Sequence, residues 1–287
     1  MKVAAIQMLS GTDRERNLAA AERLLRQAAA QGARFALLPE NFPLMGRREE
    51  DKRTIAEADG HGPIQAMLQR VAAELQIWIA AGTYPAQSQT SDRVRARLAL
   101  YGPDGSLHCH YDKLHLFDVE LPGGRESYFE SRGIEPGEQV VTAAVEAAVF
   151  GFSICYDLRF PELYRQQVAR GANVLLVPAA FTATTGAAHW HTLLRARAIE
   201  NQCFVIAANQ GGQHENGRAT YGHSVIYDPW GECLAEAGTG EAVICAELDF
   251  AALTALRQRF PVLKHQRIAV TATPAALAVS PSFGENS

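Results

Sequence analysis

The feature that most constrains the fold is the stretch of residues 147–178, which reads AAVFGFSICYDLRFPELYRQQVARGANVLLVP. An apolar strand leads to Cys155, Pro161 suits the first turn of a following helix, and Gly171 ends that helix. The apolar run from Val174 to Val177 then returns as a second strand. A strand, a helix and a strand in this order form a βαβ crossover, so the predicted fold class is α/β.

The rest of the chain continues this alternation without a Gly/Ser-rich or Pro-rich linker. Thr12 and Glu15 have the spacing of a capping box, which predicts the start of the first helix. The other predicted strands are 2–9, 34–38, 77–81, 94–100, 107–111, 204–208, 224–227 and 232–235, and the other predicted helices are 63–76, 187–201 and 250–258. We therefore predict one domain at 1–268 and an Ala/Pro/Ser-rich tail at 269–287, either disordered or laid as an arm on a neighbouring subunit.

Charge and composition exclude several classes of partner. The formal net charge of −4 argues against a basic face for nucleic acid. In the most arginine-dense stretch, Arg93, Arg95 and Arg97 alternate with apolar residues, which predicts the solvated face of a strand. No run is long enough to span a membrane, and the N-terminus does not read as a signal peptide. The odd number of cysteines then favours reduced thiols in the cytoplasm.

Glu40, Lys113 and Cys155 each follow the C-terminal end of a predicted strand, which is where open α/β sheets collect ligands. Taken singly, they read as a turn carboxylate, a solvated cation and a small buried side chain. Taken together, they supply a nucleophile, a base to remove its proton and a cation to stabilise both a thiolate and an oxyanion. The backbone N–H of Tyr156 is a candidate second oxyanion donor.

Three segments carry a resemblance to a known family. FALLPEN around Glu40, YDKLHLFD around Lys113 and GFSICYDLRFPELYR around Cys155 resemble the signature segments of the nitrilase superfamily of carbon–nitrogen hydrolases. The order and spacing of the segments fit as well, and the resemblance runs from residue 2 to about 268.

The resemblance implies a four-layer αββα sandwich and a Glu40–Lys113–Cys155 triad that works without a cofactor. In this chemistry ammonia leaves first, and water then releases the acid from a thioester. Glu130, in the segment YFES, matches a second family glutamate that positions the lysine and assists proton transfer. Related proteins pair through the helices that flank the nucleophile, so a homodimer or a higher homo-oligomer is expected.

Within the superfamily, the segment QGGQHENGRATYGHS is most similar to amidases that hydrolyse deaminated glutathione, with ω-amidases of dicarboxylic monoamides next. Ala187 and His191 depart from that pattern, because those amidases usually carry Pro and Glu there. Arg159 resembles an arginine that binds a substrate carboxylate, although an ion pair with Asp157 or Glu162 is an equal reading.

Phe181 and Thr182 follow the strand that ends at Pro178, so they are candidate pocket walls, with simple packing as the other reading for Phe181. A metal site is not predicted, because His108 and His110 share a strand face without a third ligand, and His189 and His191 diverge on a helix.

Several rival functions remain open at this point. A papain-like hydrolase would need a histidine base, and Cys155 lacks the local sequence of that class. A nitrilase or an amide or acyl transferase would use the same triad. A binding or scaffold protein on the same fold is the non-enzyme reading.

Overall fold

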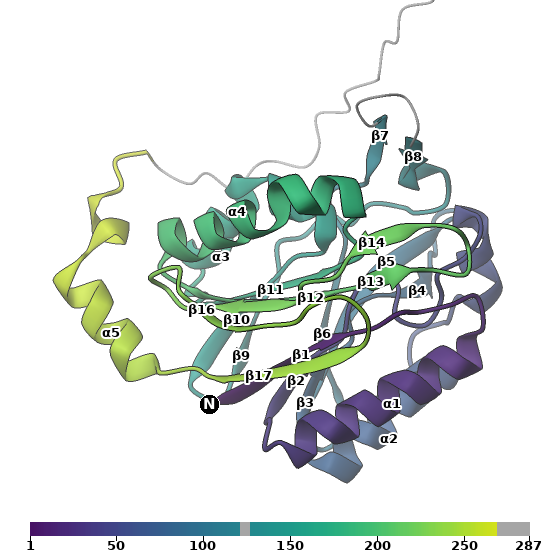
Figure 1. Ribbon diagram of the computed structural model, residues 1–287, viewed down its shortest axis with the longest axis horizontal. Coiled ribbons are helices and arrows are strands. Elements are labelled where there is room, and N and C mark those ends of the chain that lie inside the picture. The colour runs from purple at the N-terminus through teal and green to yellow at the C-terminus, as the bar shows by residue number, and fades with distance from the viewer. Residues whose placement is uncertain (121–126, 269–287) are drawn as a thin grey trace, which may run out of the picture.

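Two β-sheets pack face to face with helices on their outer sides in the computed structural model, which describes residues 1–120 and 127–268. Figure 1 shows α1 (Arg14–Ala30) and α2 (Pro63–Leu75) covering one sheet, and α3 (Pro161–Ala169) and α4 (Ala183–Asn201) covering the other. This is the expected four-layer αββα sandwich, so the predicted fold class is confirmed. The last described α-helix, α5 (Phe250–Arg259), lies at one end of the sandwich.

The first sheet contains the N-terminal strand next to one edge, paired on both sides. Its order is β17 (Ala242–Glu247), β1 (Lys2–Gln7), β2 (Phe35–Leu37), β3 (Trp78–Ala80), β5 (Val94–Tyr101) and β4 (Tyr84–Gln87), with β6 (Leu107–Asp112) also on β5. β1, β2 and β3 are parallel, whereas β5 and β6, the strands predicted at 94–100 and 107–111, pair antiparallel across Pro103-Asp104-Gly105.

The second sheet is built around the predicted βαβ crossover. Its order is β16 (Cys233–Glu236), β15 (Val225–Tyr227), β12 (Phe204–Asn209), β11 (Val174–Ala179), β10 (Ala148–Phe152) and β9 (Thr142–Val145). β10, β11 and β12 run parallel. Short hairpins, β7 (Asp118–Glu120) with β8 (Ser127–Phe129) and β13 (Gly211–Gln213) with β14 (Ala219–Tyr221), stand apart from both sheets.

The core has two layers because the central strands are buried on both faces. In β1, Val3 and Ala5 point between the sheets, whereas Ala4 and Ile6 point toward α1 and α2. A strand alternates its side chains across the sheet, so a strand covered on both sides needs a continuous apolar run. Between the sheets, Phe35 stacks on Phe150 with ring centroids 4.5 Å apart.

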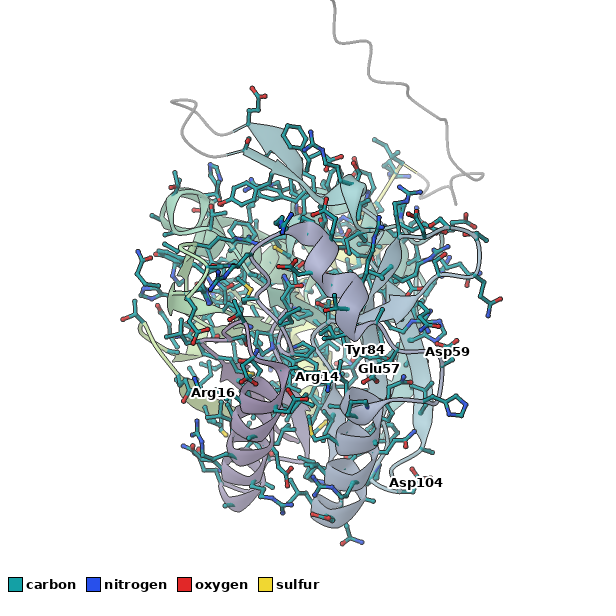
Figure 2. The ribbon with its side chains drawn as sticks, turned by 90° about the vertical axis from the view of Figure 1, so that its right-hand side faces the viewer. Arg14, Arg16, Glu57, Asp59, Tyr84 and Asp104 are labelled. Carbon is teal, nitrogen blue, oxygen red and sulfur yellow. The ribbon has the colours of Figure 1, made fainter. Side chains whose placement is uncertain are left out.

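Helix starts show where local sequence reading falls short. The first helix is capped by Asp13, whose side chain accepts the Arg16 N–H, so the predicted Thr12 cap is wrong by one residue. Thr12 instead bonds to Glu215. The cap residue of α2 is a glycine, and Glu57 accepts the Ile64 N–H at 2.6 Å in its place. Figure 2 shows Glu57 beside Asp59 and Tyr84.

The arginines of β5 do not form the predicted solvated face. Arg97 is only 7% exposed and is paired with Asp112 and Asp59. Arg95 pairs with Glu135. The alternation along the strand is correct, but the loops before and after the hairpin supply carboxylates that cover this side.

The sequence also predicts that the chain has no membrane span and that its domain ends at residue 268. None of the described helices is both long and apolar enough to cross a membrane. The tail at 269–287 lies outside the described residues, so the domain boundary at 268 stays a prediction.

Candidate active site

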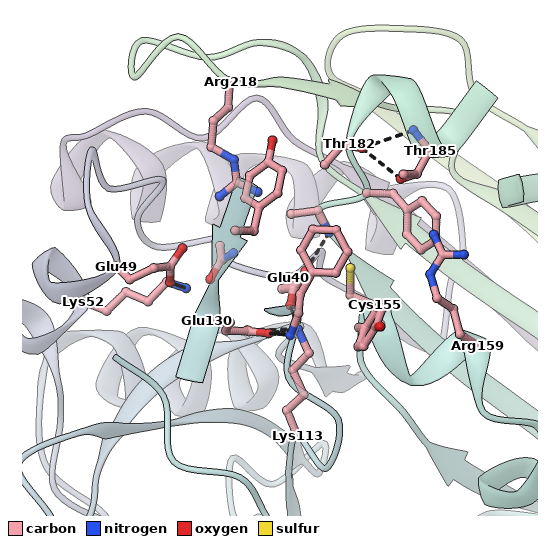
Figure 3. A pocket seen from close by; sticks show the side chains of 16 residues that line it. Glu40, Glu49, Lys52, Lys113, Glu130, Cys155, Arg159, Thr182, Thr185 and Arg218 are labelled. Atoms are coloured by element: carbon pink, nitrogen blue, oxygen red, sulfur yellow. Dashed lines mark hydrogen bonds and ion pairs between the residues drawn. The ribbon is translucent and has the colours of Figure 1, made fainter. Parts of the chain in front are cut away.

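The three residues predicted to act together do meet at one place, and Glu130 joins them (Figure 3). Glu40 follows β2, and Lys113 directly follows β6, so both come from the first sheet. Cys155 begins the 3₁₀ helix η3 (Cys155–Arg159) after β10, in the second sheet. Glu130 begins another short 3₁₀ helix, η2 (Glu130–Arg132). The pocket therefore lies where the two sheets meet at their strand ends.

Lys113 is the centre of a buried ion network. Its Nζ lies 2.7 Å from Glu40 Oε1 and 2.9 Å from each oxygen of Glu130, and its side chain is 1% exposed. Backbone groups fix both carboxylates, because Ala180 N–H donates to Glu40 Oε2 at 2.8 Å and Phe117 N–H donates to Glu130 Oε2 at 2.7 Å. The three charged groups are thus held before any substrate arrives.

The segment that carries Glu40 passes close to Gly82. The φ of Gly82 is +54°, and a Cβ at this position would lie 2.0 Å from the carbonyl oxygen of Pro39. Only glycine accepts both the left-handed backbone and this approach. The position of Glu40 therefore depends on a glycine in the neighbouring chain segment.

Charge within the network is unevenly distributed. Burial opposes ionisation of Glu40, but the Lys113 ammonium outweighs it and lowers the pKa of Glu40. Burial raises the pKa of Glu130, Lys113 opposes that effect, and the Glu40 charge adds to it. Burial works against the charged form of Lys113, yet Glu130 and Glu40 raise its pKa well above the usual value. Glu40 is therefore ionised, and Lys113 stays protonated.

The Cys155 thiol is neutral rather than ionised in the free protein. Burial raises its pKa well above the usual value, the Glu40 charge adds to this, and Lys113 only partly opposes it. Lys113 favours the thiolate, as expected, but burial and the Glu40 charge outweigh its effect in the resting site. The thiol needs a base at the moment of attack, and Glu40 is within hydrogen-bonding reach of it.

Cys155 has a strained backbone, with a φ of +47°. Asp157 braces the turn, because its fully buried carboxylate accepts the Ile154 N–H at 2.8 Å. Tyr111 Oη and the His115 N–H donate to the same carboxylate at 2.7 and 3.0 Å. Sequence reasoning considered Asp157 only as a partner for Arg159, and the structure assigns it to the nucleophile turn instead.

The remaining candidates all line the pocket, which encloses about 470 Å³ of space including its mouth. Tyr156 directly follows Cys155 and lines the pocket, so its backbone N–H stays a candidate oxyanion donor. Phe181 packs against Trp190 with centroids 5.0 Å apart while its other side faces the pocket. Thr182 is buried and caps α4 by accepting the Thr185 N–H.

Arg159 is not paired with Asp157 or Glu162. Its guanidinium lies 5.3 Å from the centroid of Phe181 and 3.3 Å from His189 Nδ1. Within residues 1–120 and 127–268 it has no acidic partner, which excludes the structural ion pair considered from the sequence. The cation is left beside the pocket.

Three charged pocket residues were not singled out from the sequence. Glu49 and Lys52 lie on the 3₁₀ helix η1 (Glu49–Ile55) and pair at 2.6 Å. Arg218 comes from the turn between β13 and β14 and lies 5.0 Å from the ring centroid of Tyr128. Its Nε is buried without a hydrogen-bond partner among the described residues. Arg218 falls inside QGGQHENGRATYGHS, so only that resemblance offered a signal for it.

Comparison with known proteins agrees with this geometry. The family model described as carbon–nitrogen hydrolase matches residues 2–258. A protein of Synechocystis sp. named deaminated glutathione amidase is 42% identical over 92% of this chain and 97% of its own. One of the same name from Yersinia enterocolitica is 37% identical over 95% of both chains.

A solved structure of the nitrilase superfamily also resembles this chain. Nit3 of Saccharomyces cerevisiae, described as a member of branch 10 of the nitrilase superfamily, has a TM-score of 0.84 and 32% identity over 93% of this chain and 97% of its own. The chain therefore belongs to the carbon–nitrogen hydrolases of the nitrilase superfamily, as an enzyme of the amidase class.

Proposed function

We propose that this enzyme hydrolyses deaminated glutathione, with Cys155 as the nucleophile. The observation that carries the proposal is the pocket itself. A neutral thiol lies beside an ionised carboxylate and a fixed ammonium. Arg159 and Arg218, neither of which forms an ion pair with a described residue, stand on opposite sides of the pocket (Figure 3). Named relatives that match nearly the full length of the chain support the choice of substrate.

In the proposed reaction, Glu40 removes the thiol proton as Sγ attacks the amide carbonyl carbon. Lys113 Nζ and the Tyr156 N–H stabilise the oxyanion, and the proton is passed to the leaving nitrogen as the C–N bond breaks. Glu40 then activates a water molecule, which attacks the thioester and releases the acid and the thiol. Glu130 holds Lys113 in place and, because its pKa is raised, assists proton transfer.

The identity of the leaving group depends on the amide. A primary amide releases ammonia. In deaminated glutathione the nitrogen of the γ-amide carries the rest of the peptide, so hydrolysis there yields 2-oxoglutarate and the dipeptide cysteinylglycine. Deaminated glutathione and the primary amide 2-oxoglutaramate would give the same acyl-enzyme, a 2-oxoglutaryl thioester. Products must therefore be identified by mass rather than by ammonia alone.

The charges of the substrate fit the cations of the pocket. Deaminated glutathione has a carboxylate at the oxo-acid end and another at the glycine end. We assign the oxo-acid carboxylate to Arg159, which is on the nucleophile helix η3, and the glycine carboxylate to Arg218 on the other side. Arginine binds carboxylates through its planar fork. Lys52, a further cation that lines the pocket, is not assigned a substrate carboxylate, because it already pairs with Glu49.

A substrate panel tests the proposal. The panel contains deaminated glutathione, 2-oxoglutaramate, succinamate and a simple nitrile, with Cys155→Ala as the blank. We expect the highest kcat/KM with deaminated glutathione. A preference for 2-oxoglutaramate would instead make the enzyme an ω-amidase, and turnover of the nitrile would make it a nitrilase. An acyl product formed only with an added amine acceptor would reveal a transferase. Tight binding of another protein, with turnover of no amide, would support the scaffold reading.

The two arginines can be told apart because 2-oxoglutaramate keeps the oxo-acid carboxylate and lacks the glycine end. Arg159→Met should raise KM for both substrates. Arg218→Met should raise KM for deaminated glutathione about 10-fold or more and leave 2-oxoglutaramate nearly unchanged. Equal effects of Arg218→Met on both substrates would overturn the assignment of the glycine end.

We also propose a homo-oligomer, most simply a homodimer, that works in the cytoplasm. Exposed apolar side chains gather where α4 ends, at the β15–β16 turn and after α5, with Ile199 47%, Trp230 57% and Phe260 52% exposed. Such a patch is typical of an interface. All five cysteines are free, as expected in a reducing compartment. Analytical ultracentrifugation of wild type and Trp230→Arg tests the interface.

A further inference from the structure

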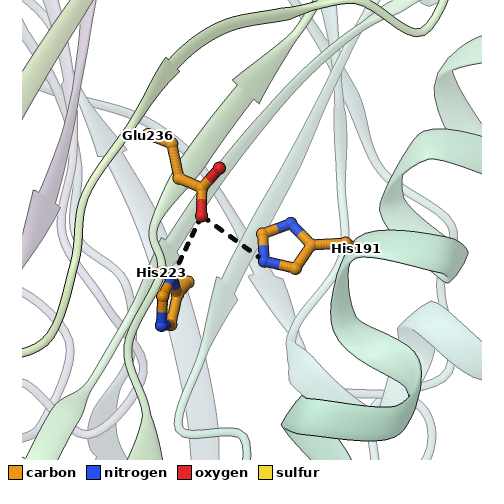
Figure 4. A group of neighbouring side chains, drawn as sticks. All are labelled: His191, His223 and Glu236. Atoms are coloured by element: carbon orange, nitrogen blue, oxygen red, sulfur yellow. Dashed lines mark hydrogen bonds and ion pairs between the residues drawn. The ribbon is translucent and has the colours of Figure 1, made fainter.

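Three side chains outside the active site converge on one point (Figure 4). His191 comes from α4, His223 precedes β15, and Glu236 ends β16. His223 Nδ1 lies 3.0 Å and His191 Nε2 lies 3.5 Å from the same oxygen, Oε1 of Glu236. The potential ligand atoms all lie within 4.8 Å of one another.

The two distances to Glu236 are compatible with a metal coordination sphere. Zinc binds imidazole nitrogen and carboxylate oxygen at about 2.0–2.1 Å in a tetrahedron, which places neighbouring ligand atoms roughly 3.3–3.4 Å apart. The distances of 3.0 and 3.5 Å bracket that value. The side chains are 30–39% exposed, so solvent can reach the site and fill a remaining coordination position.

The contact between His191 and Glu236 is longer than an ordinary hydrogen bond. His191 Nδ1 lies 3.0 Å from Tyr227 Oη, whereas Nε2 is at 3.5 Å from the carboxylate, outside the usual range of a hydrogen bond. A neutral ring that donates its Nδ1 proton to Tyr227 turns the lone pair of Nε2 toward the carboxylate oxygen. A cation between these two acceptors relieves their repulsion. A polar group that fixes the other ring nitrogen is also what metal-binding histidines commonly have.

We propose that His191, His223 and Glu236 bind a divalent transition metal ion, with Zn²⁺ as the best match. Two imidazoles and a carboxylate suit zinc and are poor ligands for calcium or magnesium. The bound ion would join α4 to β15 and β16, which are remote in the sequence. This group has no signal in the sequence, because the partners of His191 come from the segment before β15 and from the end of β16 rather than from its own helix.

The site lies behind a wall of the catalytic pocket. Trp190, the neighbour of His191, donates its indole N–H to the carbonyl oxygen of His223 at 2.7 Å and packs against Phe181. A metal clamp therefore stabilises the layer that supports Phe181, without taking part in the reaction. The inference does not depend on the proposed substrate.

Zinc competition against a chromophoric chelator tests the proposal, with His191→Ala, His223→Asn and Glu236→Gln as variants. Asn is chosen at 223 because the φ of His223 is +52°, and asparagine tolerates this backbone conformation. His189→Ala, two residues from His191 on α4, is the matched control. We expect each ligand variant to weaken zinc binding about 10-fold or more and the control to bind like wild type.

Two further readings separate this site from the free cysteines. Cobalt bound here should give the visible absorption of a tetrahedral N/O site without a thiolate charge-transfer band. Zinc should raise the melting temperature of wild type and of His189→Ala, but not of His191→Ala or Glu236→Gln. Unchanged zinc affinity in these two variants, or a thiolate band that persists in them, would overturn the proposal. Even if His223→Asn fails to fold, the other two variants decide the outcome.

Discussion

Lys113 and Arg97 are both buried cations held between two carboxylates; Arg97 lies on β5, and Lys113 directly follows the neighbouring strand β6. Arg97 pairs in register with Asp112, the residue directly before Lys113. The Arg97 side chain donates to Asp112 through Nε at 2.8 Å and Nη2 at 2.9 Å. Lys113 also has both carboxylates in place, at 2.7 and 2.9 Å. Their surroundings, however, differ completely.

The guanidinium of Arg97 pairs with the carboxylates of Asp59 and Asp112, and no thiol among the described residues lies beside it. Its hydrogen bonds are therefore structural. Lys113 shares a pocket with Cys155, and its carboxylates are fixed by backbone N–H groups at the ends of other segments. Burial and charge alone therefore do not identify a catalytic group. The adjoining nucleophile and the space for a substrate do.

The largest expected effect separates these two cations directly. Lys113→Met removes the oxyanion cation and leaves Glu40 and Glu130 without their counter-ion, so kcat/KM should fall on the order of 10⁴-fold. Arg97→Met should leave kcat/KM per folded molecule within about 3-fold. Steady-state kinetics corrected for the folded fraction provide the test. Equal losses of activity in both variants would break the comparison.

Arg97→Met should act on stability instead. Removing one partner of a buried pair leaves the other uncompensated, which typically costs about 3–5 kcal/mol. The loss should be near the lower end of that range because the side chain of Asp59 is 62% exposed. Urea unfolding at constant m-value measures the free energy of unfolding. A loss below about 1 kcal/mol would mean that this network contributes little.

Glu40→Gln should lower kcat/KM about 10²–10⁴-fold, because it removes the base and keeps the shape. In wild type, kcat/KM should fall at low pH as Glu40 becomes protonated, because the base must be ionised. This fall should occur below pH 4.5, the ordinary pKa of glutamate, because Lys113 lowers the pKa of Glu40. The measurement is the pH profile of kcat/KM. An acid limb near neutral pH would assign the base to another group.

Glu130→Gln should have a smaller effect, about 10- to 100-fold on kcat, because Glu130 acts through Lys113. KM should change little, since Glu130 binds the lysine rather than the substrate carboxylates. Separate measurement of kcat and KM distinguishes this role from a general loss of structure. A rise in KM with unchanged kcat would contradict it.

The smallest expected effect concerns the resting thiol. Because burial raises the pKa of Cys155, the rate of its alkylation should still increase with pH above the usual thiol value of 9.0. Glu40→Gln removes a charge that raises this pKa, so the increase should begin at lower pH. Iodoacetamide labelling followed by peptide mapping reads Cys155 alone. A plateau near neutral pH would indicate a preformed thiolate.

Local patterns predicted the crossover around Cys155 and the strands at 94–100 and 107–111 well, because strand alternation and turn residues are short-range signals. They placed Glu40, Lys113 and Cys155 at strand ends. That these strand ends belong to two sheets packed face to face was predicted only from the family resemblance. Glu130 was found only through that resemblance, since a glutamate in a short 3₁₀ helix has no distinctive spacing. Arg97 was misread because the carboxylates of Asp59 and Asp112 reach it only after folding.

The central claim, that Cys155 forms a thioester with the acyl part of an amide, is tested most directly by trapping that intermediate. Rapid acid quench of the enzyme with deaminated glutathione, followed by intact-protein and peptide mass spectrometry, measures the adduct and its position. The account predicts a 2-oxoglutaryl group on Cys155, absent from a folded and inactive Cys155→Ala. Turnover by Cys155→Ala, or an adduct on another residue, would contradict it.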